Sequence, residues 1–502
     1  MSKNILLFAD GTGNKGGSTP DSNVYKLYRS IDLHDENLEQ IVFYDNGVGT
    51  QTNNYIRGLS AALGFGFQNN VCDLYEYLAR HYDPGDSIYM FGFSRGAATI
   101  CAFNGFIDSC GLIDGRGKGN SELKAEVHSA IKAYKKPAQH AAHLKDITLH
   151  ENKPNITFIG VWDTVSALGF PERTDTVTPL LTVLNVAFRV MAAIADKLIP
   201  HKYYNYELTP NITTARQALA IDDERTSFWP KVWKEDTKEA AKVDSIRQVW
   251  FTGMHSNVGG GYERAGLANA SYHWMLSQLS GIKFKSNILD KAAADANVNG
   301  RMYNSRHGLA SFYRYHPRMI GELCKEAGVE VQIHESVLRR LRLRTANYAP
   351  RMLPESFTVV DNADNTEPSP SVYSGHWQLF KSQLNRTIFL RKVLYGIQLD
   401  IVLLILSLAA ILKFTDLLNL PAKTPSDFQL SLVNALEFIS PDVFDDVIQL
   451  IVVTYPLLGA CIATIIILFL IVRGKARKIT SKFAERLRKL IIHPGEPHPK
   501  FP

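Results

Sequence analysis

The feature that most restricts the fold of this chain is a serine held between two glycines at the end of an apolar run. The run is Ser87–Phe93, and it continues as Ser94-Arg95-Gly96 before residues that favour a helix. A serine at the apex of a sharp strand-to-helix turn has a strained backbone, and a neighbouring Cβ would crowd it, so glycine is favoured on both sides. Its hydroxyl would project above a sheet, at the positive end of the following helix. The pattern predicts a nucleophile elbow.

Apolar runs that end in polar residues recur along the first half of the chain. Their continuous apolar character indicates strands buried on both faces, as in a parallel sheet with helices between the strands. In such sheets ligands bind beyond the carboxyl ends of the strands. We therefore predict an α/β fold, with a mostly parallel sheet, helices on both faces and a site at this edge. The runs and the polar residues after them are Ile5–Ala9 before Asp10-Gly11-Thr12-Gly13-Asn14, Gln40–Tyr44 before Asp45-Asn46, Ile156–Trp162 before Asp163-Thr164, Ala215–Ile221 before Asp222-Asp223, and Gln248–Thr252 before His255-Ser256-Asn257.

A serine, an acid and a histidine occur in the chain order expected of α/β-hydrolases. Nucleophilic acyl transfer needs a base near the serine, an acid that orients the base, and N–H donors for the oxyanion. His255 is the predicted base, because it follows an apolar run in a glycine-rich loop. Asp163 and Asp222 are both candidates for the acid. Asp163 is favoured, because the charged residues after Asp222 suit the first turn of a helix, which Asp often caps.

The first polar cluster predicts the oxyanion hole. Its donors would be the backbone amides of Gly11 and Thr12, together with the amide of Arg95 after the serine. Asp10 has two interpretations that the residues leave open: it caps a helix, or it orients this loop.

These segments together resemble the catalytic domain of type VI secretion phospholipase effectors, which has an α/β-hydrolase fold. The resemblance implies a Ser-His-Asp lipase that acts on acyl esters of glycerophospholipids without a metal or other cofactor, with Ser94, His255 and Asp163 as the triad. One departure is Ile100-Cys101, where the family would have Ala-Arg. The matching stretches are Phe8–Asn14, Tyr44–Thr50, Gly92–Ala97, Gly160–Val165, Ala218–Arg225 and His255–Tyr262, with a looser match at Tyr313–Arg318 and Ile333–Val337. They place the catalytic domain at residues 1–355.

An insertion between the acid and the histidine, residues 174–208, is apolar on several faces. It predicts either an ordinary core helix or a cap over the site that offers acyl chains an apolar groove.

The C-terminal part of the sequence predicts a membrane anchor. Val447–Val472 runs for 26 residues without a charge, and a bilayer crossing takes about 20 apolar residues. An earlier stretch, Val393–Leu412, is apolar enough to insert despite Asp400. We therefore predict a transmembrane hairpin within residues 391–472, with spans 393–412 and 447–472, after a linker at 356–390 and before a basic tail at 473–502.

The charges around the spans predict the orientation. Basic residues precede the first span and nine Lys or Arg against two Glu follow the second, whereas six acids and two lysines lie between them. By the positive-inside rule, the catalytic domain and the C-terminus would both be cytoplasmic. No signal peptide is expected, because Met1–Ala9 leads directly into the first strand. The predicted location is the bacterial inner membrane; the alternative is an exported effector that inserts into a target membrane.

The predicted function is a membrane-anchored serine hydrolase of phospholipase A type. The alternatives are an esterase for other esters and a catalytically silent membrane sensor or scaffold with a hydrolase fold. The net charge of +6 lies mostly in the tail, whose apolar and basic residues suit anionic headgroups rather than nucleic acid. The expected partners are a phospholipid membrane and a lipid substrate, and a homo-oligomer is left open. Five scattered cysteines without a CxxC pair indicate a reducing compartment, and no zinc-binding spacing is present.

Overall fold

The chain divides into two units in the computed structural model. The larger contains Met1–Glu172, Ala192–Trp377 and Leu487–Pro502, and the smaller contains Arg173–Met191 and Gln378–Arg486. The structure describes residues 2–47 except 12, 15 and 19, and residues 66–165, 206–235, 243, 245–306, 313, 315–350, 352–368, 377–414, 425–439, 448–449, 452–453 and 456–490.

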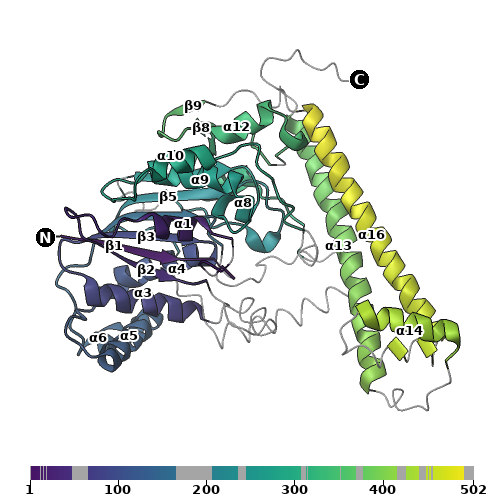
Figure 1. Cartoon of the computed structure of the whole chain (residues 1–502), viewed down its shortest axis with the longest axis horizontal. Coiled ribbons are helices and arrows are strands. Elements are labelled where there is room, and N and C mark those ends of the chain that lie inside the picture. The colour runs from purple at the N-terminus through teal and green to yellow at the C-terminus, as the bar shows by residue number, and fades with distance from the viewer. Residues whose placement is uncertain are drawn as a thin grey trace. The chain divides into compact units, whose positions relative to one another are not determined.

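A sheet of nine strands forms the centre of the larger unit (Figure 1). Its order is β2-β1-β3-β4-β5-β6-β7-β8-β9, and all neighbouring strands are parallel except β8 and β9. The strands are β1 (Asn4–Ala9), β2 (Gln40–Asp45), β3 (Ser87–Phe93), β4 (Ile156–Trp162), β5 (Ile212–Ala220), β6 (Ser245–Phe251), β7 (Gln332–His334), β8 (Thr358–Val360) and β9 (Thr366–Pro368). The prediction of a mostly parallel sheet is confirmed.

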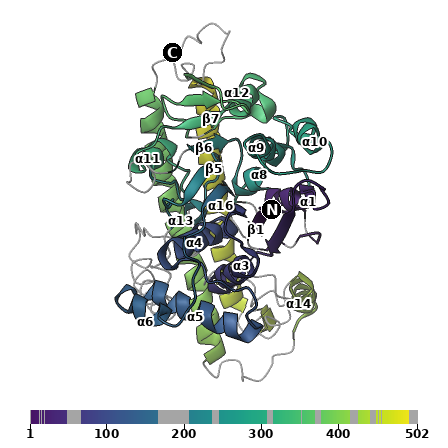
Figure 2. The ribbon, with the colours of Figure 1, turned by 90° about the vertical axis from the view of Figure 1, so that its left-hand side faces the viewer.

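Helices cover both faces of this sheet, as the continuous apolar runs predict (Figure 2). On β1, Ile5 and Leu7 face one hydrophobic core, and Leu6 and Phe8 face the other. The first core includes α3 (Phe67–His81), α4 (Arg95–Cys110) and α5 (Asn120–Lys135). The second includes α1 (Asn23–Ser30), α9 (Gly266–Ser277) and α10 (Ile288–Asp295). Further described helices are α6 (His140–Leu144), α8 (His255–Gly259), α11 (Ile320–Glu326) and α12 (Glu335–Arg342).

The predicted linker at 356–390 begins with residues that form the last two strands of the sheet in the structure. β8 pairs with β7, and Phe357 and Val360 are buried. Each of these strands has only three residues, and the segment is rich in Asn, Asp, Ser and Pro, which are typical of loops. The sequence pattern therefore does not predict β8 and β9.

The described part of the smaller unit includes most of α13 (Trp377–Phe414), α14 (Asp427–Ile439) and most of α16 (Pro456–Leu490). α13 and α16 lie side by side (Figures 1 and 2), with the rings of Phe380 and Phe483 stacked at 6.0 Å between centroids. The first half of the predicted tail at 473–502 continues α16 to Leu490.

The predicted transmembrane hairpin is not supported. The first span, 393–412, lies within α13, but most of its side chains, at 399, 400 and 402–412, lie outside the described residues. In the second span, 447–472, residues 447, 450, 451, 454 and 455 lie outside the described part of the chain, as do the side chains of 456–462. Among the helical residues that the structure does describe, no segment reaches the length and apolar content needed to cross a membrane.

Two further predicted features lie outside the described residues. They are Thr12 of the oxyanion loop and residues 174–205 of the predicted cap.

Candidate active site

Ser94 occupies a sharp turn between β3 and α4. Its backbone has φ 59° and ψ −121°, a conformation that residues other than glycine rarely adopt. A Cβ on Gly92 would lie 2.6 Å from the Cα atom of Ala97, and a Cβ on Gly96 would lie 2.1 Å from the carbonyl oxygen of Ala9. Both glycines are therefore required, because α4 begins against the ends of β3 and β1.

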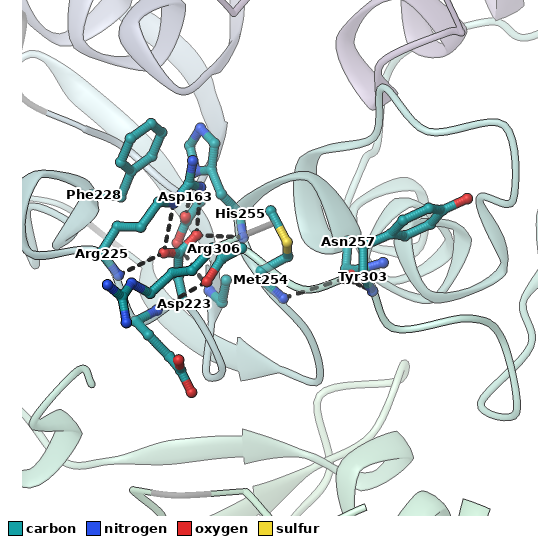
Figure 3. A network of polar contacts seen from close by, with 12 residues as sticks. Asp163, Asp223, Arg225, Phe228, Met254, His255, Asn257, Tyr303 and Arg306 are labelled. Atoms are coloured by element: carbon teal, nitrogen blue, oxygen red, sulfur yellow. Dashed lines mark hydrogen bonds and ion pairs between the residues drawn. The ribbon is translucent and has the colours of Figure 1, made fainter. Parts of the chain in front are cut away.

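Asp163 and His255 come together at the carboxyl ends of β4 and β6. The Nδ1 atom of His255 lies 2.6 Å from the Oδ2 atom of Asp163, and both side chains are buried (Figure 3). The imidazole also packs against the ring of Phe93, with 4.6 Å between centroids. Since Phe93 directly precedes Ser94, the His255 ring lies beside the turn that carries the serine.

Asp222, the alternative acid, has different partners. Its Oδ2 atom accepts hydrogen bonds from the amide of Gly253 at 2.7 Å and from the hydroxyl of Tyr348 at 2.9 Å. It does not cap an α-helix, because the residues after it lead to a short 3-10 turn, η2 (Thr226–Phe228). The geometry therefore favours Asp163 over Asp222 as the partner of His255.

Asp10 orients the loop after β1. Its buried carboxylate accepts hydrogen bonds from the side chains of Ser22 at 2.5 Å, Tyr44 at 2.7 Å and Asn14 at 3.1 Å, and burial raises its pKa. It also accepts from the amide of Gly11 at 2.6 Å. The N–H of Gly11 is thus donated to Asp10, whereas the sequence predicts it as a donor to the oxyanion. Asp side chains often bind nearby backbone N–H groups in this way. The amide of Arg95 remains as a donor candidate in the first turn of α4.

Two charged residues at the site have no role in the sequence-based prediction. Arg318 places its Nη1 and Nη2 atoms 2.6 and 2.7 Å from the two carboxylate oxygens of Asp163, and it is fully buried. Asp223 accepts the backbone N–H of His255 at 3.3 Å and forms an ion pair with Arg225 at 2.6 Å (Figure 3). In the sequence, only the looser family resemblance at Tyr313–Arg318 includes Arg318, and it gives this residue no role.

Burial favours a neutral imidazole at His255, beside an ionised Asp163. Burial alone would raise the pKa of Asp163, but Arg318 and His255 outweigh it and hold that pKa below its usual range. Burial lowers the pKa of His255, although the hydrogen bond with Asp163 acts in the opposite direction. An ionised carboxylate only accepts hydrogen bonds, so Nδ1 of His255 carries the proton and Nε2 can act as a base.

The family of the chain follows from a comparison with known families. The family described as "T6SS, Phospholipase effector Tle1-like, catalytic domain" matches residues 3–278, which is more than half of the chain. This chain belongs to the Tle1-like family. The match includes Ser94, Asp163 and His255, whereas Arg318 lies beyond its end. The description of the family names phospholipase effectors.

Individual relatives of this Tle1-like chain are distant. "Uncharacterized protein YEL023C" of Saccharomyces cerevisiae is 31% identical over 189 residues, which cover 33% of this chain and 27% of that protein. An uncharacterized protein from Pseudomonas aeruginosa has a crystal structure with 14% identity and a TM-score of 0.34, over 89% of this chain and 63% of that one. The Tle1 effector bound to the VgrG spike of the type 6 secretion system has 16% identity and a TM-score of 0.26, over 53% and 52%. The chain thus covers less than two thirds of each of these three proteins.

Proposed function

We propose that this Tle1-like protein is a serine hydrolase that cleaves acyl esters of phospholipids. Ser94 is the nucleophile, His255 is the general base, and Asp163 orients His255. The observation that carries the proposal is the 2.6 Å contact between His255 and Asp163, made by an imidazole that packs against the residue before Ser94.

The proposed reaction follows from these positions. Nε2 of His255 takes the proton of Ser94 as Oγ attacks the acyl carbonyl carbon, and the same proton then passes to the departing alcohol. A water molecule, deprotonated by His255, then attacks the acyl-enzyme, and His255 returns this proton to Oγ of Ser94 as the fatty acid is released. The oxyanion that forms in each half-reaction is stabilised by the N–H of Arg95 and by the positive end of α4.

The smaller unit supports a lipid surface as the partner of the enzyme. Ile467 and Leu470 on α16 are 56% and 55% exposed, and the exposed basic residues Lys475, Arg477 and Lys478 follow them on the same helix. An exposed apolar segment next to cations suits the interface of an anionic membrane. Family membership favours the exported effector over the resident inner-membrane protein, since the family is described as one of secretion effectors.

The test of the proposed function is fatty acid release from vesicles of phosphatidylcholine and phosphatidylglycerol by the purified full chain. We expect release by the wild type, none by Ser94→Ala, and unchanged release by Ser121→Ala, which alters an exposed serine on α5. A triglyceride emulsion and a short-chain ester tested in parallel identify an esterase for other esters. Equal release by wild type and Ser94→Ala would reject the assignment, and no release from any ester would favour the silent scaffold.

A further inference from the structure

The guanidinium of Arg318 connects the ends of three segments at the candidate site. Nη1 lies 2.6 Å from Oδ1 of Asp163, after β4, and 2.5 Å from the carbonyl oxygen of Ala220, at the end of β5. Nη2 lies 2.7 Å from Oδ2 of Asp163 and also donates to the carbonyl oxygen of Phe228, in η2. The side chain is completely buried, so these contacts replace solvent around both ions.

These contacts fix the orientation of the Asp163 carboxylate. Oδ1 accepts from Arg318 and from the amide of Ala220 at 2.9 Å, while Oδ2 accepts from Arg318 and His255. A planar guanidinium that binds both oxygens sets the plane of the carboxylate as well as its charge, which the ammonium group of a lysine does not do.

Arg318 also binds Phe228, a residue that packs against the imidazole of His255. The ring of Phe228 meets the ring of His255 edge to face, at 5.2 Å and 75° (Figure 3). Because the carbonyl of Phe228 is a hydrogen-bond acceptor of Arg318, one side chain holds both the acid partner of His255 and a residue that packs against its ring.

We propose that Arg318 is a positioning residue for the reaction: it holds the Asp163 carboxylate ionised and correctly oriented, and its charge disfavours a lasting proton on His255. This inference rests on the proposed function of Ser94, His255 and Asp163. Since the family match ends at residue 278, a later part of the chain completes the site.

The charges near His255 set the direction of the expected effect. Among the residues that the structure describes, they include the anions Asp163 and Asp223 and the cations Arg225 and Arg318. Removal of the Arg318 cation leaves the anions in excess, which stabilises the protonated imidazole and raises the pKa of His255. The base is active only when neutral, so the acid limb of the pH–rate profile moves to higher pH.

The experiment compares variants on a short-chain ester dissolved in water, with kcat and KM measured against pH. Arg318→Gln is expected to lower kcat by about 10²-fold at an almost unchanged KM and to move the acid limb upward. Arg318→Lys keeps the charge, so it is expected to keep the wild-type acid limb while kcat falls. Arg340→Gln is the matched control, because Arg340 is only 2% exposed and donates to the carbonyls of Val298 and Gly300. It is expected to lower the melting temperature without moving the acid limb.

A double-mutant cycle separates positioning from a structural role. If Arg318 acts through Asp163, adding Arg318→Gln to Asp163→Asn produces little further loss of kcat. Independent, multiplicative losses, or an unmoved acid limb in Arg318→Gln, would overturn the inference.

A readout that does not need turnover distinguishes failure of this inference from failure of the proposed function. The titration of His255 is followed by NMR in protein labelled at the histidine ring carbon, in a Ser94→Ala background. A higher pKa of His255 in Arg318→Gln supports the coupling between Arg318 and His255 even if no ester is hydrolysed. An unchanged pKa would contradict it.

Discussion

Two residues of the candidate site have backbone conformations that are unfavourable for any residue other than glycine. The φ angle is 59° at Ser94 and 44° at Asp163. Such strain persists where the surrounding structure determines the conformation, and it is concentrated at functional sites. At Ser94 the constraint is the close packing of Gly92 and Gly96, and at Asp163 it is the set of hydrogen bonds from Arg318, Ala220 and His255.

Replacement of Asp163 by Asn separates the two candidate acids. We expect Asp163→Asn to lower kcat by about 10⁴-fold, because an amide favours the wrong tautomer of His255. Asp222→Asn should leave kcat close to the wild type and lower stability only, since Asp222 binds Gly253 and Tyr348. Steady-state kinetics on a short-chain ester measure both, and the reverse order of losses would identify Asp222 as the acid.

The pH dependence of the wild type follows from the buried imidazole. Burial lowers the pKa of His255 below its ordinary value of 6.5, so the neutral base persists in more acidic solution. The acid limb of kcat/KM should therefore have its midpoint below pH 6.5. A midpoint clearly above that value would show that Asp163 stabilises the protonated ring more than burial destabilises it.

At the scale of elements, the carboxyl ends of the parallel strands bring distant residues together. Ser94 follows β3, Asp163 follows β4, and His255 lies four residues after β6. Long apolar strands reveal this arrangement in the sequence, so the sheet through β6 and the residues at its edge could be predicted. The three-residue strands β7, β8 and β9 could not, because they are too short for a hydrophobic pattern.

The close approach of α4 to β1 gives a stability prediction. Gly96→Ala places a Cβ 2.1 Å from a backbone oxygen, which cannot move aside as a side chain could. We expect a loss of unfolding free energy of about 1–3 kcal/mol or more, visible as a lower melting temperature. Gly321→Ala, on α11, is the control, because its nearest contact is an ordinary 3.4 Å. Equal melting temperatures of Gly96→Ala and the wild type would contradict the described turn.

At the scale of the whole chain, the site includes a residue that the sequence pattern did not connect with it. Arg318 is 155 residues from Asp163 along the chain, and neither local spacing nor periodicity connects them. An isolated arginine is usually exposed, so sequence reasoning had no physical ground to place it in the core. The sequence favoured Asp163 but kept Asp222 as an alternative, because both follow similar strands, and only the three-dimensional contacts show which of them lies against His255.

The proposed lipid contact of the smaller unit gives a prediction for the complete protein. Ile467→Asp combined with Leu470→Asp should reduce binding to anionic vesicles in a flotation assay, because two exposed apolar side chains become charged. Hydrolysis of a short-chain ester should be unchanged. The control is Glu485→Gln, an exposed site on the same helix. Undiminished flotation of the double variant would locate membrane binding elsewhere.

The most direct test of the serine nucleophile is mass spectrometry of the protein after reaction with a fluorophosphonate, which modifies only an activated serine. The account predicts one adduct on the peptide that contains Ser94, and its loss when His255 is replaced by Gln in a protein that remains folded. An unmodified Ser94, or an adduct that forms equally well without His255, would contradict the account.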